Sequence, residues 1–297
     1  MTDLGNVLTA MVTPFDDEGE IDFARAGELA ADLAENGSDG LVVAGTTGES
    51  ATMTHAEKLD LFRCVIDAAG DKAKIVAGTG NNDTKDTCEF TAEASKLDLD
   101  AVMLVGPYYN KPSQEGLFQH FKAGAAATEL PVIAYNVPGR TSKNIETDTT
   151  VRLAEEIDNI AAVKEASGDM LQISEIIRRV PDDFAVYSGD DFITLPMLSL
   201  GAKGIISVVS NVAGNIVQDM VSAYYAGDTA RAAALHHKLF PLYDACFLPS
   251  GNPACVKRAM QISGWDPGGV RLPVIPASEA DTAQIREACE GIGLASA

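Results

Sequence analysis

Short apolar runs recur along the chain, and each is separated from the next by a segment whose apolar residues return every three or four positions. An apolar run that ends in turn residues predicts a buried parallel strand, and the longer periodic segments predict amphipathic helices. The predicted strands are residues 7–12, 40–44, 74–77, 101–105, 132–135, 160–164, 184–187 and 204–207. The predicted helices between them are residues 22–35, 54–69, 84–96, 114–128, 147–156, 172–180, 191–200 and 216–225.

This strand–helix alternation predicts an α/β fold with a parallel sheet. Eight such units predict a (β/α)8 TIM barrel over residues 1–226. No phosphate-binding glycine pattern follows the first strand, which counts against a dinucleotide-binding fold. Beyond the barrel the pattern contains helices alone, at 229–243, 253–262 and 279–290, and predicts a C-terminal helical extension over residues 227–297. Two helix starts carry capping residues: Asp22, and Thr54 with Glu57 in a capping-box pattern.

Composition narrows the class of protein. The apolar stretches are far shorter than the about 20 residues that cross a membrane, and residues 1–6 carry no basic region of a signal peptide. A formal net charge of −21 counts against nucleic acid or an anionic membrane as partner. The five cysteines are widely spaced without a C-x-x-C pair, and the adjacent His236 and His237 would face different sides of a helix. We expect a reduced, cytoplasmic protein without a metal.

The most informative residue is Lys164, which ends an apolar run and is followed by turn residues. A free lysine has a pKa of about 10.4, so roughly one amine in 2,500 is neutral at pH 7. Desolvation at the tip of a buried strand disfavours the charged form, and a pKa near 7 takes about 5 kcal/mol of differential destabilisation. A neutral lysine attacks carbonyls and forms Schiff bases. The alternative is a structural lysine whose ammonium reaches water along its own stem.

Three further strand ends carry unusual chemistry. Residues 45–50, Gly-Thr-Thr-Gly-Glu-Ser, form a tight loop whose amides can hold a carboxylate. Residues 106–112 include the adjacent Tyr108 and Tyr109, and residues 135–142 begin with Tyr135 and include Arg140. Each has a simpler explanation as a turn, packing residue or surface charge. However, active residues of a TIM barrel come from the C-terminal ends of several strands, where all of these lie.

Together these motifs resemble one family. Residues 45–50, 108–112, 135–141, 164–168, 188–191 and 204–211 are similar to those of the pyruvate-dependent class I aldolases of the dihydrodipicolinate synthase and N-acetylneuraminate lyase superfamily. The similarity runs over essentially the whole chain and is greatest with the dihydrodipicolinate synthase branch. It implies a lyase of the diaminopimelate route to lysine that condenses pyruvate with aspartate-β-semialdehyde. It also implies a homotetramer built as a dimer of dimers and no cofactor, because the lysine imine is the electron sink.

The resemblance implies four catalytic residues. Lys164 would form the Schiff base with pyruvate, and Tyr135 would donate and accept protons during imine and enamine formation. Thr46 would link Tyr135 to Tyr109 in a proton relay, with Tyr109 supplied by a neighbouring subunit. A chain of hydroxyl groups fits this chemistry, since imine formation needs a proton source for the departing hydroxide.

The resemblance also implies four substrate-binding residues. Thr47 would bind the pyruvate carboxylate, mainly through its backbone amide, Ile206 would contact pyruvate through its carbonyl, and Gly189 would line the site. Arg140, at the mouth, would hold the carboxylate of the semialdehyde, for which a planar guanidinium is well suited.

Two alternative functions assign different roles to these residues. An aldolase for a 2-keto-3-deoxy sugar acid or for 4-hydroxy-2-oxoglutarate would keep Lys164 and Tyr135 but use Arg140 differently. A non-catalytic barrel that senses small carboxylates would need Lys164 to be protonated and inert.

Feedback inhibition by lysine is expected to be weak. Some relatives bind lysine in an interface pocket, which residues such as Ser50 and Tyr108 match. Lys58 and Asp86 depart from the sensitive pattern, which has a histidine and a glutamate at these places. The ammonium of Lys58 would repel a cationic effector by about 1 kcal/mol or more at close range.

Overall fold

The computed structural model describes residues 3–295, and within this part of the chain the strands form a closed parallel barrel in the order β1 to β8. The predicted (β/α)8 TIM barrel is therefore confirmed. The chain divides into two compact units. Unit 1 comprises residues 3–5 and Ile75–Ile206, and unit 2 comprises Asn6–Lys74 and residues 207–295.

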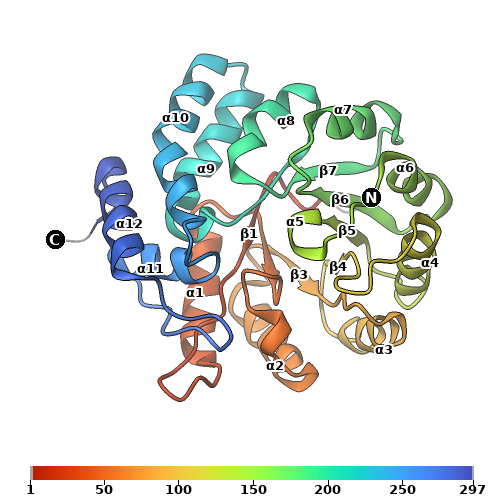
Figure 1. Cartoon of the computed structure of the whole chain (residues 1–297), viewed down its shortest axis with the longest axis horizontal. Helices are drawn as coiled ribbons and strands as arrows, with labels where there is room; N and C mark the ends of the chain where they lie inside the picture. Colours follow the sequence, from red (N-terminus) through yellow and green to blue (C-terminus); the bar gives the residue numbers. More distant parts are fainter. Residues whose placement is uncertain (1–2, 296–297) are drawn as a thin grey trace. The chain divides into compact units, whose positions relative to one another are not determined.

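Unit 1 consists of a run of parallel strands with intervening helices. Its strands are β3 (Lys74–Gly78, without Lys74), β4 (Ala101–Val105), β5 (Val132–Asn136), β6 (Ile160–Glu165), β7 (Ala185–Ser188) and β8 (Gly204–Ser207, without Ser207). Its helices are α3 (Thr84–Ala94), α4 (Gln114–Ala125), α5 (Pro138–Thr141), α6 (Thr147–Glu156), α7 (Met170–Arg179), η2 (Asp191–Ile193) and α8 (Thr194–Leu200). Each strand from β3 to β7 pairs in parallel with the next, and Figure 1 shows α3, α4, α6, α7 and α8 outside these strands.

The core of unit 1 explains why these strands read as continuous apolar runs. Outward-facing strand residues such as Leu104 and Val163 are buried against helix residues such as Phe118, Phe121 and Ile173. Helices on one face and barrel interior on the other bury a parallel strand on both faces, so both alternating sets of its side chains are apolar. In β5, β6 and β7 polar side chains enter this pattern at the C-terminal ends of the strands.

Unit 2 joins the beginning and the end of the sequence. It contains β1 (Val7–Ala10), α1 (Phe23–Glu35), β2 (Gly40–Val43), η1 (Ser50–Thr52), α2 (His55–Ala69), α9 (Ser210–Tyr225), α10 (Thr229–Cys246), α11 (Ala254–Ile262) and α12 (Glu279–Ile292). Within this unit α10 packs against α9 and α12, and α11 packs against α12 (Figure 1). Both predicted caps are confirmed: Asp22 accepts from the Arg25 amide, and Thr54 and Glu57 form the complete capping box.

Two helices differ from the predictions. No helix was predicted for residues 138–141, which form the short helix α5; Pro138 starts it because its fixed φ suits a first helical position. The helix expected from residue 216 begins at Ser210, because non-helical torsions at Ala213 (φ −130°, ψ 37°) interrupt its apolar periodicity. The other boundaries differ by a few residues; α3 and α4, for example, end at Ala94 and Ala125 instead of 96 and 128.

The strand–helix alternation ends with α9, and α10, α11 and α12 follow it. The division into a barrel over 1–226 and an extension over 227–297 stays a prediction. No helix within residues 3–295 is long and apolar enough to cross a membrane. The five cysteines are free thiols, and Cys246, Cys255 and Cys289 are buried.

Candidate active site

Lys164 and Tyr135 face each other at the ends of two neighbouring strands of unit 1. They are register partners in the parallel pairing of β5 with β6, so their side chains point to the same side of the sheet. The Lys164 Nζ atom lies 4.4 Å from the centroid of the Tyr135 ring. Each residue is only 5% exposed. The structure therefore brings the expected nucleophile and the expected proton donor together.

The electrostatics of Lys164 favour the neutral amine. Burial lowers the pKa of Lys164 to about 7, the negative charge of Asp191 opposes this shift, and the positive charge of Arg140 adds to it. The alternative of a water-reaching structural lysine conflicts with this burial. At pH 7 about half of the amines are then neutral, compared with roughly one in 2,500 for a free lysine. A neutral amine at the end of a barrel strand can attack a carbonyl carbon.

Gly189 leaves room for the stem of this lysine. A Cβ atom at Gly189 would lie 3.1 Å from both Cγ and Cε of Lys164 and 2.8 Å from Cβ of Ala166. The Gly189 amide donates to the Glu165 carbonyl at 2.8 Å, which holds the turn after β7 against β6. Any larger residue would displace the lysine or the backbone, so this glycine is required by the geometry of the site.

Asn136 and Glu165, the next residues along β5 and β6, fix this arrangement from the opposite face, and neither was among the predicted site residues. Asn136 Nδ2 donates to both carboxylate oxygens of Glu165, at 3.2 and 3.0 Å, and Asn136 Oδ1 accepts from the Ile145 amide at 2.9 Å. Glu165 also accepts from the Ser167 amide at 2.7 Å and from Gln172 at 3.4 Å. Burial raises the pKa of Glu165, and these donors oppose the shift. In the sequence these two polar residues, Asn136 and Glu165, directly follow Tyr135 and Lys164, and this adjacency was the signal that could have identified them.

Arg140 lies in α5, directly after β5, and is exposed. The positive charge of Arg140 lowers the pKa of Lys164, so the guanidinium lies within electrostatic reach of the amine. Its backbone amide donates to the Val137 carbonyl at 2.9 Å, so the short helix sets the position from which the side chain extends. An exposed arginine beside a buried lysine can hold an anionic group at the entrance of the site.

The two adjacent tyrosines after β4 differ in their surroundings. Tyr108 is half-buried, its hydroxyl donates to Asn81 Oδ1 at 3.4 Å, and burial raises the pKa of its phenol. Tyr109 is 88% exposed and has a left-handed backbone with φ 73°. A non-glycine residue held in this region is uncommon and often marks a functional site. Asn110 braces the turn, since its amide donates to the Tyr108 carbonyl at 2.9 Å.

The loop with Thr46 and Thr47 belongs to unit 2. Its turn is closed by bonds from the Glu49 amide to the Thr46 carbonyl (3.1 Å) and from the Ser50 amide to the Gly45 carbonyl (3.3 Å). Thr47 is buried at 3% exposure, and its hydroxyl accepts a hydrogen bond of 2.9 Å from Asn252 Nδ2.

Of the remaining predicted site residues, Ile206 lies in β8 and is fully buried. In unit 1 the structure thus gathers Lys164, Tyr135 and Gly189, with Arg140 within electrostatic reach. Within residues 3–295 no group of three or more histidine, cysteine or acidic side chains is placed to hold a metal ion.

A parallel barrel with a buried lysine of lowered pKa beside a tyrosine at its strand ends defines a class of enzyme, the lysine-dependent lyases that act through a Schiff base. Residues 3–291 match the model of the dihydrodipicolinate synthetase family. The chain belongs to this family.

Individual relatives agree over nearly the full length. The chain is 56% identical over 290 residues to the 4-hydroxy-tetrahydrodipicolinate synthase of Moorella thermoacetica, covering 98% of this chain and 99% of the relative. The crystal structure of dihydrodipicolinate synthase from Bacillus anthracis superposes with a TM-score of 0.95 at 49% identity, covering 98% and 99% of the two chains. The chloride-inhibited enzyme from Acinetobacter baumannii complexed with pyruvate has a TM-score of 0.95 at 39% identity, covering 98% and 100%.

Proposed function

We propose that this chain has the 4-hydroxy-tetrahydrodipicolinate synthase activity for which its relatives are named. In this reaction pyruvate condenses with L-aspartate 4-semialdehyde, with loss of one water, on the diaminopimelate route to lysine. The observation that carries the proposal is the buried amine of Lys164, whose pKa is about 7 and which lies 4.4 Å from the Tyr135 ring centroid.

The chemistry follows from a neutral amine in a dry site. Lys164 Nζ attacks the keto carbon of pyruvate, and the resulting carbinolamine loses water to give an imine. Loss of a proton from the methyl carbon converts the imine to an enamine, whose carbon then bonds to the aldehyde carbon of the semialdehyde. Finally the amino group of the semialdehyde attacks the imine carbon, closes the ring and releases the lysine amine.

Proton transfer in these steps is assigned to hydroxyl groups. Tyr135 is proposed to protonate the departing hydroxide and to accept the proton again, since its ring lies beside the amine. Thr46 and Tyr109 are proposed to continue the relay, as the family resemblance implies. Tyr109 is 88% exposed in the isolated chain, which supports its reaching the site of a neighbouring copy. Such a site in trans requires at least a dimer, and a homotetramer is proposed.

Substrate binding is assigned to four residues. Thr47, with the amides of its loop, is proposed to bind the pyruvate carboxylate, and the Ile206 carbonyl to contact pyruvate. Gly189 is proposed to line the site next to the lysine stem, which its missing Cβ accommodates. Arg140 is proposed to bind the carboxylate of the semialdehyde, because it is exposed and its charge is sensed at Lys164.

A cytoplasmic location is proposed as well. Cys246, Cys255 and Cys289 are buried free thiols, and burial raises the pKa of the Cys255 thiol to about 11. Free cysteines are typical of a reducing compartment.

Reduction of the trapped imine tests the nucleophile. The protein is incubated with pyruvate, reduced with borohydride and digested, and the adduct is located by peptide mass. We expect a single adduct on Lys164, its loss in Lys164→Met, and its retention in the control Lys143→Met. An adduct on any other lysine, or none, contradicts the proposal.

Turnover of competing substrates tests the reaction. Condensation of pyruvate with the semialdehyde is compared with cleavage of 2-keto-3-deoxy sugar acids and of 4-hydroxy-2-oxoglutarate. We expect the semialdehyde to give by far the highest kcat/KM. Preference for a sugar acid would instead support the alternative aldolase, and adduct formation without turnover of any substrate would support a sensor.

A further inference from the structure

The loop Gly45–Ser50 of unit 2 is held by side chains that come from the far end of the sequence. Asn252, Lys257 and Arg271 each contact it. All of these residues lie within unit 2. The loop therefore depends on the C-terminal part of the chain for its shape.

The contact with Thr47 orients a hydroxyl group. Asn252 Nδ2 donates to Thr47 Oγ1 at 2.9 Å, a separation of 205 residues along the chain. Because an amide nitrogen can only donate here, the threonine hydrogen must point away from Asn252. A hydroxyl that already accepts is left to act as a donor, which is what an incoming carboxylate needs. Thr47 is buried, so little water competes for this bond.

The contact with Glu49 is a buried ion pair. Lys257 Nζ lies 2.8 Å from Glu49 Oε1, and both side chains are 3% exposed. The same ammonium donates to the Gly269 carbonyl at 2.6 Å and lies 4.3 Å from the centroid of the Phe15 ring. An ion pair with these additional partners has a fixed geometry, so it holds Glu49 in one position.

Glu49 also constrains the backbone of the loop. Its φ of 60° lies in the left-handed region, which costs energy for a residue with a side chain. Its Oε2 atom accepts from the Arg271 amide at 2.9 Å. The Arg271 guanidinium donates to the Gly19 carbonyl at 2.6 Å and pairs with Glu57, so it joins the neighbouring segments as well. Glu49 is thus held on both carboxylate oxygens, two residues beyond Thr47.

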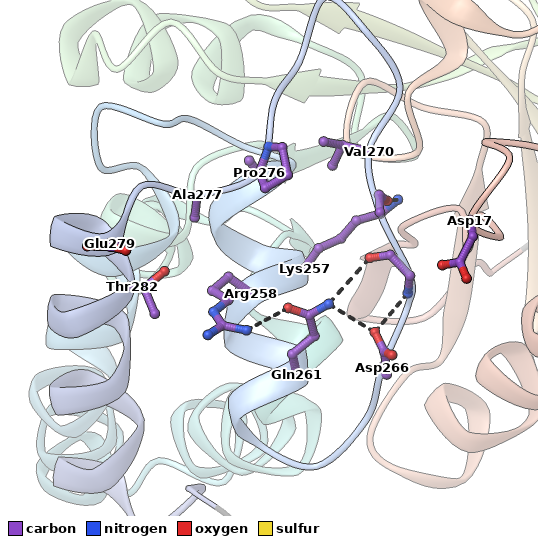
Figure 2. A pocket seen from close by; sticks show the side chains of 13 residues that line it. Asp17, Lys257, Arg258, Gln261, Asp266, Val270, Pro276, Ala277, Glu279 and Thr282 are labelled. Carbon is purple, nitrogen blue, oxygen red and sulfur yellow. Dashed lines mark hydrogen bonds between the residues drawn. The ribbon is translucent and has the colours of Figure 1, made fainter.

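The segment that supplies these partners is itself braced. Figure 2 shows Lys257 reaching from α11 toward the loop with Val270, while Gln261 bonds to Arg258, Asp266 and the Gly268 backbone. Gln261 Nε2 donates to Asp266 Oδ1 at 2.9 Å, and the same Asp266 oxygen accepts from the Gly268 amide at 3.0 Å. The loop before Arg271 is therefore fixed on α11, the helix that also carries Lys257.

We propose that Asn252 is a positioning residue for the pyruvate carboxylate, acting through the Thr47 hydroxyl on a loop that the Lys257–Glu49 pair holds in place. This inference rests on the proposed function, because it takes Thr47 as the carboxylate-binding residue. It adds a specific role for the C-terminal segment: that segment sets affinity for the keto acid and leaves the chemistry of Lys164 unchanged.

Two substitutions separate positioning from packing. Asn252→Ala removes the donor, whereas Asn252→Asp keeps the shape and replaces the donor by an acceptor that turns the Thr47 hydrogen toward itself. The pyruvate concentration that half-saturates borohydride-trapped adduct is measured for each, with thermal unfolding as a check on folding. We expect both variants to raise this concentration about tenfold or more, because each loses one hydrogen bond in a buried site. The limiting amount of adduct should stay unchanged.

A second ketone provides the specific readout. Methyl pyruvate carries the same reactive carbonyl but no carboxylate, so both variants should trap it as the natural protein does. The matched control is Asn215→Ala. It removes an exposed hydrogen bond in the same unit, from Asn215 Nδ2 to Asn36 Oδ1, which is also 2.9 Å long. It should leave both ketones unaffected.

The outcomes are distinguishable. Unchanged half-saturation by pyruvate in both variants, or an equal loss with methyl pyruvate, overturns the positioning role while leaving the proposed reaction intact. Absence of any adduct in the natural protein overturns the proposed function, and the positioning role with it.

Discussion

The stem of Lys164 runs so close to Gly189 that a Cβ atom there would lie 3.1 Å from both its Cγ and its Cε. Gly189→Ala should therefore push the amine away from its position beside Tyr135. We expect the rate of pyruvate adduct formation to fall about tenfold to a hundredfold, since small misplacements of a reacting group have effects of this size. Stopped borohydride trapping measures the rate. Gly291→Ala on α12, where nothing lies within 4 Å of a new Cβ, is the control and should form adduct normally.

The pH dependence of adduct formation should follow the amine of Lys164. Since only the neutral form reacts, the rate should fall about tenfold per unit below the pKa of about 7 and level off above it. The charges of Asp191 and Arg140 act on this pKa in opposite directions. Asp191→Asn should move the acid limb to lower pH, and Arg140→Gln should move it to higher pH. Trapping with pyruvate alone measures both without involving the second substrate, and equal shifts in one direction would contradict the assignment.

Burial of this lysine should also lower stability at neutral pH. Its pKa is lower in the folded protein than in the unfolded chain, so the unfolded chain binds more protons between pH 7 and about 10.4. Stability of the natural protein therefore rises with pH across this window. Lys164→Met removes that dependence, and the variant should be more stable than the natural protein at pH 7. The difference in their free energies of unfolding should shrink by about 2 kcal/mol from pH 7 to pH 9. Urea unfolding of both proteins at the two pH values measures this difference, and a difference that grows with pH would refute the assignment.

The buried and exposed ion pairs of unit 2 should differ sharply. Lys257→Met leaves the Glu49 carboxylate buried without its partner, and we expect a loss of about 3–5 kcal/mol in the free energy of unfolding. The double variant Lys257→Met/Glu49→Gln should recover much of it. Lys72→Met breaks the exposed pair with Glu35, whose atoms are 2.6 Å apart, and should change stability little. Similar effects at both pairs would show that burial is not the cause.

Free lysine should inhibit weakly. Lys58 on α2 adds an ammonium at a place where sensitive relatives are expected to have histidine, and Asp86 on α3 is shorter than the expected glutamate. Asp86 instead accepts from Asn81 Nδ2 at 2.5 Å. Micromolar lysine should therefore leave turnover unchanged, and Lys58→His together with Asp86→Glu should increase sensitivity. Inhibition of the natural protein at micromolar lysine would contradict this prediction.

The sequence predicted the residues that end strands better than those that support them. Lys164 and Tyr135 stand at the ends of apolar runs, and a parallel barrel places such ends on one face. The partnership of Asn136 with Glu165 was not predicted, because their further partners Asn144 and Gln172 come from a loop and a helix. The periodicity of apolar residues predicts which face of a strand or helix a residue occupies. It does not predict which side chains of other elements contact that residue.

Short or interrupted helices were missed for a related reason. The four residues of α5 are too few to show a helical period, and their Pro-Gly start resembles a turn. In α9 the torsions of Ala213 break the period near its start. The contact of Asn252 with Thr47 joins residues 205 positions apart, and no local pattern in one sequence encodes it.

Unit 2 joins residues 6–74 to residues 207–295, and this has a consequence for synthesis on the ribosome. Thr47 and Glu49 emerge early, while Asn252, Lys257 and Arg271 are among the last residues to be made. A nascent chain therefore carries Lys164 before the loop of residues 45–50 has acquired its supports. The loop gains these supports only when translation is nearly complete, and chains cut short before Arg271 lack the backbone amide that donates to Glu49.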